Sequence, residues 1–162
     1  MSRWTWPTTA DLGIRAMSST LEGLFVESAL GVLEAMQPDL PESLHVKSGE
    51  WEIALHRVDG DVSNAVLLLA WLDEILFRAQ HAGEWLLDAA VQIADDVDKR
   101  RVRASVHWTD GASIDRGVEV KAISSHGLCV EFVQPDAVLP GILDHVPELV
   151  GPAWYADTIL DV

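Results

Sequence analysis

The chain has 162 residues, of which 49% are apolar, and its formal net charge at pH 7 is −15. This length predicts one domain, residues 1–162, with a hydrophobic core of its own. The negative charge argues against direct nucleic-acid binding, which depends on cations that neutralise phosphates, and suits a basic partner or divalent cations instead.

Membrane insertion and export are not expected. The apolar run that contains Leu67–Leu72 is too short to cross a bilayer and is followed at once by two acidic residues. The first residues lack the basic-then-apolar order of a secretory signal. Cys129 is the only cysteine, so an internal disulfide is excluded. These features together predict a cytoplasmic protein.

The first third of the chain predicts an extended segment followed by a helix. Residues Trp4–Ile14 are expected to be extended, with an interruption at Pro7. Ser19 has the form of a helix cap, because Glu22 follows it at capping-box spacing. Apolar residues then recur at helical spacing as far as Met36.

A strand and a second helix are expected next. Alternating apolar residues predict a strand over Glu50–Val58. Asp61 or Ser63 can cap a helix that runs from about Val62 to Gln80, and Gly83 lies just beyond its end. The first half of this helix is apolar nearly all round, which predicts a central place in the core.

The second half of the chain is typical of a sheet. Val118–Ile123 and Leu128–Val133 flank Ser124–Gly127 and predict a hairpin. The remaining expected strands are Trp85–Ile93, Val102–Trp108 and Trp154–Leu160. The predicted fold is therefore α+β, with two long helices packed on a mostly antiparallel sheet.

Three short motifs stand in a characteristic order. They are Thr9–Gly13 near the amino end, Glu119–Leu128 in the second half and Ile159–Val162 at the carboxyl end. Together they resemble the archease family, whose members assist the RtcB-type RNA ligase. The resemblance implies an archease-like fold and an accessory factor that promotes ligase guanylylation and multiple turnover in tRNA splicing or RNA repair.

The resemblance also implies a site. The family's matching acids bind a divalent cation, usually calcium, and these positions are Asp11, Asp161 and the terminal carboxylate of Val162. Hard cations take oxygen ligands, so the chemistry is coherent. The family places a functionally important lysine near the metal, which is Lys121 here. Without the family resemblance, Asp11 and Asp161 would be interpreted as surface carboxylates, and Lys121 as a surface lysine paired with Glu119.

Other candidate groups are expected to be structural. His126 precedes Gly127 in a tight turn, Cys129 has no activating partner, and Glu74 is not assigned to the site. The chain contains no phosphate-binding loop, dinucleotide fingerprint or nucleophile elbow. These observations predict that the protein is not an enzyme.

The sequence departs from the family pattern in three places. Archeases usually carry Glu-His where Pro7 and Thr8 stand, an acid near the place of Ala70, and an aromatic residue at Ser125. The change at Thr8 removes a possible partner contact and leaves the carboxylates in place. Residues 134–153 carry four prolines and are predicted to be an insertion loop, which either covers core or offers contact surface to a partner.

Two other functions remain open. A general chaperone or scaffold for RNA-modifying enzymes would need an exposed apolar groove, for which residues 134–153 are candidates. A metal-dependent hydrolase would use Asp11 and Asp161 to activate water.

Overall fold

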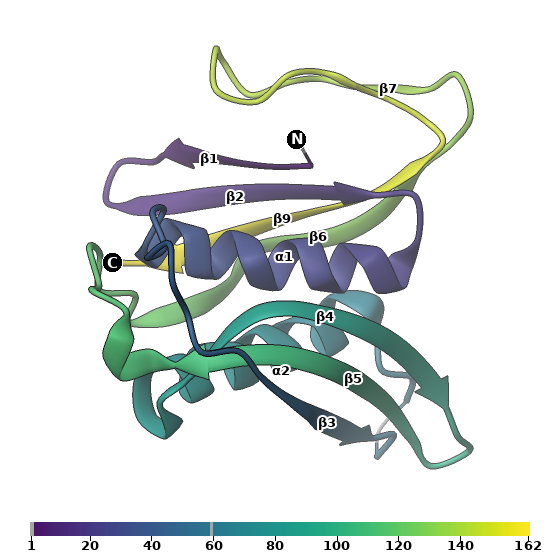
Figure 1. Ribbon diagram of the computed structural model, residues 1–162. Coiled ribbons are helices and arrows are strands. Elements are labelled where there is room, and N and C mark those ends of the chain that lie inside the picture. The colour runs from purple at the N-terminus through teal and green to yellow at the C-terminus, as the bar shows by residue number, and fades with distance from the viewer. Residues whose placement is uncertain (1, 59) are drawn as a thin grey trace.

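The computed structural model describes residues 2–58 and 60–162 and is shown in Figure 1. The two α-helices lie in the first half of the chain among strands, and the second half is mostly strands. Their bounds are β1 (Arg3–Pro7), β2 (Asp11–Ser18), α1 (Leu21–Met36), β3 (Lys47–His56), α2 (Asn64–Phe77), η1 (Arg78–Ala82), β4 (Glu84–Asp95), β5 (Lys99–Asp110), η2 (Gly111–Ser113), β6 (Ala122–Val133), β7 (Val138–Leu139), β8 (Leu149–Val150) and β9 (Ala153–Asp161).

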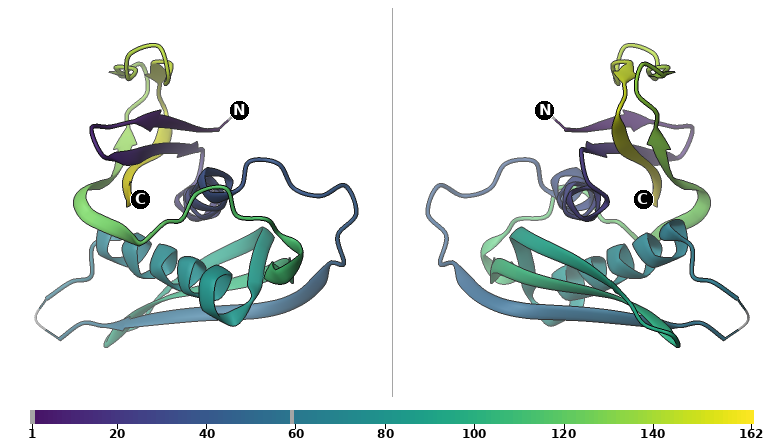
Figure 2. Two further views of the ribbon diagram at one scale, coloured as in Figure 1. Left: turned by 90° about the vertical axis from the view of Figure 1, so that its left-hand side faces the viewer. Right: turned by 90° about the vertical axis from the view of Figure 1, so that its right-hand side faces the viewer.

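The elements form three layers. One layer is an antiparallel sheet in the order β1-β2-β9-β6, and another is an antiparallel sheet in the order β3-β5-β4. Between them, α1 packs on β2 and β9 on one side and on β4 on the other, while α2 packs on β6, β3 and β5. Figure 2 shows the helices between the two sheets. No helix in residues 2–58 and 60–162 is long and apolar enough to span a membrane.

The predicted arrangement of two long helices packed on one sheet is wrong. Strands account for 46% of the chain and helices for 24%, and each helix is covered on two sides by different sheets. This double coverage explains why both helices are apolar around much of their surface. The largest side chains with almost no exposed area include Phe25, Trp71 and Trp85, which contribute to the core from α1, α2 and β4.

The helix ends follow from side-chain capping. The first helix is capped by Thr20 rather than by Ser19, because the Thr20 hydroxyl accepts a 3.0 Å hydrogen bond from the Gly23 amide. In α2 the cap is Ser63, which accepts from the Val66 amide at 3.1 Å. The turn after α2 ends at Gly83, whose φ of 70° suits a residue without a side chain.

The predicted hairpin around Ser124–Gly127 is also wrong. Both flanking segments belong to β6 and pair with the same strand, β9: Ser124 lies opposite Ile159, and Cys129 lies opposite Asp157. The residues between them form an irregularity in one continuous strand. Gly127 has a φ of 77° there, so its conformational freedom serves a bulge rather than a reversal of direction.

Residues 134–153 form a small hairpin whose strands are β7 and β8. Figure 1 shows this segment over β1 and β2, on the side of the sheet away from α1. Val146 is buried, whereas Leu143 is 88% exposed. The segment therefore combines a buried attachment with an exposed apolar tip.

Candidate metal site at the end of the four-stranded sheet

The pairing of β2 with β9 brings the two predicted acidic ligands together. Their register runs from Asp11 opposite Asp161 to Ser18 opposite Trp154. Asp161 also lies opposite Ala122, the first residue of β6. Figure 1 shows the C-terminus at the same end of the sheet as the turn between β1 and β2. Residues from the two ends of the chain thus become direct neighbours.

Strand alternation places both carboxylates on one face of the sheet. Ile14 and Leu160 are buried in the core beneath α1, so Asp11 and Asp161, at odd offsets from them, point to the opposite face. Directly opposed side chains have Cβ atoms about 4.5–5.5 Å apart, and like charges at that spacing repel. Both aspartates are half-buried.

The main chain of Asp11 is held by Thr8. The Asp11 amide donates to the Thr8 hydroxyl at 3.1 Å, and the Thr8 amide donates to the Asp11 carbonyl at 3.0 Å. Thr8 therefore supports the turn before Asp11. Within residues 2–58 and 60–162, neither the Asp11 nor the Asp161 carboxylate has a hydrogen-bond or ion-pair partner.

Lys121 reaches the same end of the sheet from the segment before β6. Its amide donates to the Asp161 carbonyl at 2.7 Å, and its Nζ lies 3.4 Å from the main-chain oxygen of Val162. Lys121 precedes the strand on which it was expected. The structure thus gathers Asp11, Asp161, Val162 and Lys121, the four predicted residues.

The donor set is suited to a hard cation but is sparse. The described residues contain no group of three or more His, Cys, Asp or Glu side chains able to hold a metal. The strand register sets only two acidic side chains, Asp11 and Asp161, side by side among these residues. Calcium takes six to eight oxygens in flexible geometry, so such a site would depend on additional oxygens from the main chain, water or a partner.

Comparison with known proteins decides the family. The Archease protein family matches residues 5–162. The chain belongs to the Archease family. The solution structure of Methanobacterium thermoautotrophicum protein 1598 has the same fold, with a TM-score of 0.60, 24% sequence identity and 99% of each chain covered. No curated protein matches the chain.

Membership of the Archease family confirms the resemblance drawn from the three motifs. It supports an accessory role in RNA processing, because the family is one of non-catalytic accessory proteins. The Thr9–Gly13 and Ile159–Val162 motifs of this archease sequence are the two strand ends that meet at the candidate site.

A tryptophan covers the sheet next to the Archease motif. Trp6 lies opposite Gly13, and a Cβ added to Gly13 would lie 2.1 Å from Cε2 of the indole. Gly13 is therefore required by the close approach of this ring. The ring in turn restricts the backbone two residues from Asp11.

Replacing Gly13 with alanine should destabilise the protein by about 1–3 kcal/mol, because the indole must move to admit the methyl group. Urea denaturation followed by tryptophan fluorescence measures this change. Gly49→Ala is the matched control, since its added Cβ would meet its nearest neighbour at 3.5 Å, an ordinary contact. Equal stability of the two variants would contradict the steric argument.

A buried ion pair on the same face was missed by sequence reasoning. Arg15 lies opposite Asp157 and is 5% exposed. Its Nε and Nη2 donate to the two Asp157 carboxylate oxygens, each at 2.7 Å, and its Nη1 donates to the Pro140 carbonyl at 2.9 Å. The hydrogen bond to Asp157 raises the pKa of Arg15. Arg15 thus ties both strands to residues 134–153.

The ion pair continues into a polar cluster. The Arg15 guanidinium carbon lies 5.2 Å from the centroid of the Tyr155 ring, and the Tyr155 hydroxyl donates to Glu131 at 2.9 Å. Burial, together with that hydrogen bond, raises the pKa of Tyr155. An arginine between apolar residues of a strand, such as Arg15, is predicted to lie on the surface. The sequence therefore contained no indication of this buried polar cluster.

The remaining candidates have structural roles. Burial raises the pKa of the Cys129 thiol, which favours the unreactive protonated form. The His126 amide donates to the Ser124 hydroxyl at 3.1 Å within the bulge. Glu74 accepts from Arg78 at 2.8 Å, one turn along the helix.

Proposed function

We propose that the chain promotes guanylylation and multiple turnover of an RtcB-type RNA ligase in tRNA splicing or RNA repair. Family membership supports an accessory role in RNA processing. The observation that carries the finer proposal is the register that sets Asp11 opposite Asp161, with Lys121 hydrogen-bonded to the Asp161 carbonyl. The ligase supplies the reacting groups, and this protein supplies fixed charges that help to position them.

The proposed mechanism uses the acidic tip, defined as Asp11, Asp161, Val162 and Lys121. The tip would hold a divalent cation, proposed to be calcium, between the two carboxylates, because a cation removes the repulsion between them. Lys121 would contact a phosphate or carboxylate of the partner. Such fixed charges lower the electrostatic and entropic cost of bringing a nucleotide and a nucleophile together.

The terminal carboxylate is a further proposed ligand. In a chain that ends at Val162, this group would add a third negatively charged oxygen donor beside the two aspartates. Adding one glycine after Val162 converts that carboxylate into a neutral amide. Weaker calcium binding by the extended chain would support the assignment, and unchanged binding would remove Val162 from the ligand set.

The overall charge favours a basic surface on the partner. A net charge of −15 speeds encounter with a positively charged protein and disfavours direct binding to RNA. The proposed contact is therefore between this protein and the ligase, with the RNA bound by the ligase.

Single-turnover guanylylation of the cognate ligase tests the proposal. The wild-type chain should accelerate formation of the guanylylated ligase, and Asp11→Asn, Asp161→Asn and Lys121→Gln should each reduce the acceleration at least about tenfold, the effect of losing about 1.4 kcal/mol of stabilisation. Asp98→Asn is the matched control, because Asp98 is exposed in the turn between β4 and β5.

Two outcomes would count against the proposal. Undiminished stimulation by all three tip variants would reject the site. Absence of any stimulation, combined with protection of unrelated proteins from aggregation, would favour the general chaperone instead. The exposed Val138, Leu143 and Val150 of the 134–153 segment are the side chains that such a chaperone would use.

A further inference from the structure

The basic side chains of this acidic protein are unequally neutralised. The chain has 11 Lys and Arg residues, and seven of them form ion pairs within residues 2–58 and 60–162. The ion-paired residues are Arg3, Arg15, Arg57, Arg78, Arg100, Arg101 and Arg103. In the same described residues Lys47, Lys99, Arg116 and Lys121 form no ion pair with an acidic side chain.

Two of these four cations line one cleft. The cleft has a volume of about 680 Å³ and is bounded by the end of α1, the turn after α2 and the segment before β6. Its lining includes Met36, Gln80, His81, Arg116, Glu119 and Lys121. Small-molecule sites typically measure about 300–1,000 Å³, so the cleft has the size of a ligand site.

Hydrogen bonds hold the walls of the cleft in place. Arg116 Nη2 donates to the carbonyl of the buried Ala79 at 2.7 Å, and Gln80 Nε2 donates to the Val120 carbonyl at 2.5 Å. One nitrogen of the Arg116 guanidinium is thus anchored. Within the described residues its other N–H groups make no hydrogen bond, so an anchored donor fork remains available to a ligand.

Lys121 is also available to a ligand. Its Nζ has one long contact, 3.4 Å, with the Val162 oxygen, and the side chain is exposed. Glu119 is the one acidic side chain among the residues that line the cleft, so the two permanent cations of the lining exceed its acidic side-chain charge. This local excess is unusual in a chain with a net charge of −15.

A second cleft differs from the first one in the ion-pairing of its cation. It lies between β1 and α1, has a volume of about 480 Å³ and includes Arg3 and Glu34 in its lining. The Arg3 guanidinium is already paired with Glu27 and Glu34. Arg3 is the only cation among the described residues that line this cleft, and it already has acidic partners. Within that part of the chain, the cleft therefore has no unpaired cation that could bind an anion.

We propose that the cleft lined by Arg116 and Lys121 binds a phosphate-bearing anion, such as the polyphosphate of a nucleotide. An arginine fork recognises phosphate oxygens geometrically, and a lysine adds a mobile charge. Lys121 belongs both to this cleft and to the acidic tip, so a bound phosphate would lie beside the proposed cation. That last link rests on the proposed function, whereas anion binding by the cleft does not.

Calorimetric titration of inorganic tripolyphosphate into the metal-free full chain, without ligase and at low ionic strength, tests the proposal. Wild-type protein should bind, and Arg116→Gln and Lys121→Gln should each weaken binding about tenfold, as expected for loss of a charge-assisted hydrogen bond. Glu119→Gln should strengthen binding, because it removes the acid from the lining. A gain of affinity cannot arise from misfolding.

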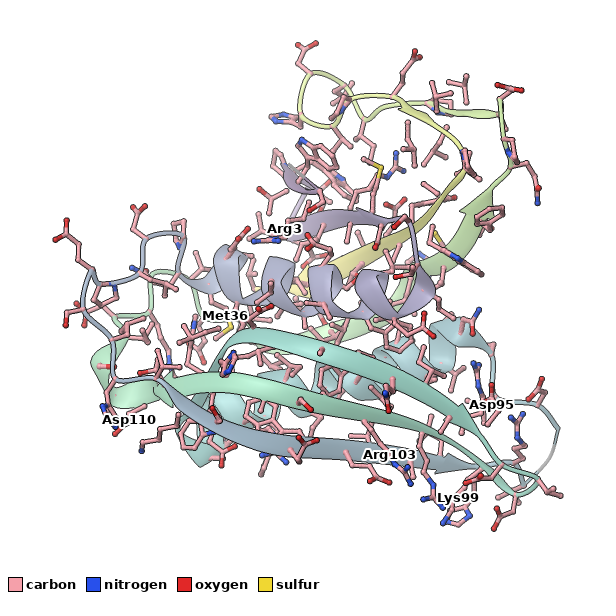
Figure 3. The ribbon with its side chains drawn as sticks, turned by 45° about the vertical axis from the view of Figure 1, so that its right-hand side comes forward. Arg3, Met36, Asp95, Lys99, Arg103 and Asp110 are labelled. Atoms are coloured by element: carbon pink, nitrogen blue, oxygen red, sulfur yellow. The ribbon has the colours of Figure 1, made fainter. Side chains whose placement is uncertain are left out.

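The control is Lys99→Gln, which removes the same charge far from the cleft. Figure 3 shows Lys99 at one end of the β3-β5-β4 sheet and Met36, a cleft residue, toward the other end with Asp110. This variant should bind tripolyphosphate as the wild type does. A loss of affinity equal to that of Arg116→Gln would overturn the proposal, because binding would then depend only on net charge.

Parallel titrations identify the part of a nucleotide that is recognised. Guanosine triphosphate should bind at least as well as tripolyphosphate, and guanosine without phosphates should not bind. Absence of binding by tripolyphosphate to the wild-type chain, or binding of guanosine alone, would overturn the proposal. Because no ligase or metal is present, these results are independent of the guanylylation test.

Discussion

Calcium in about 100-fold excess over its Kd should raise the Tm of the wild-type chain by about 5–10 °C. Saturation to this degree stabilises the folded state by about 2.7 kcal/mol, and each kcal/mol shifts the Tm of a domain this size by about 2–4 °C. The physical reason is the opposed Asp11 and Asp161 pair, whose repulsion the cation replaces with attraction. Thermal unfolding with calcium or with a chelator measures the shift.

Most substitutions destabilise a protein, but a substitution that neutralises one aspartate of the tip should not destabilise the metal-free chain. Asp161→Asn removes one of two facing like charges, so the metal-free variant should be at least as stable as the wild type, yet calcium should no longer raise its Tm. Asp98→Asn should keep the full calcium response. An Asp161→Asn protein that is less stable without metal and still responds to calcium would contradict the site.

Replacing Arg15 with methionine should destabilise the protein by about 3–5 kcal/mol. The substitution leaves the Asp157 carboxylate without its partner in a half-buried position, and unpaired buried charges cost about this much. It also removes the donor to the Pro140 carbonyl, so residues 134–153 should become more sensitive to proteases. Urea denaturation measures the first effect and limited proteolysis the second.

A second substitution separates the lost charge pairing from lost packing. Adding Asp157→Leu to Arg15→Met removes the unpaired charge, and replacing both partners of a buried ion pair by apolar groups is often neutral. The double variant should therefore recover most of the stability lost by the single variant. If the double variant is less stable than the single one, the ion-pair explanation is wrong.

Local patterns were sufficient for most helices and strands. Helical spacing and a capping box at Ser19 predict α1, although the cap proved to be Thr20, and alternation predicts β4, β5 and β9. These signals work because helix periodicity, capping and strand alternation depend on residues close together in sequence. The same reasoning failed at Ser124–Gly127, because a polar segment with a positive-φ glycine is compatible with both a turn and a bulge.

At the candidate site, too, the sequence predicts the residues but not their arrangement in space. The motifs alone name Asp11, Lys121, Asp161 and Val162, and the family match over residues 5–162 confirms the resemblance on which they depend. Their proximity follows only from the β2–β9 register. The Arg116 cleft had no motif, because its residues come from segments that meet only in the folded chain.

Residue order thus accounts for the acidic character, the helix and strand signals and the family motifs, since each is a property of a short segment or of composition. The three-layer arrangement, the strand order and the Arg15–Asp157 pair arise from contacts between segments far apart in the chain. An apolar helix surface predicts that the helix will be buried, but it does not predict which sheet will cover it. That choice depends on the free energy of burying all surfaces together, which no single segment contains.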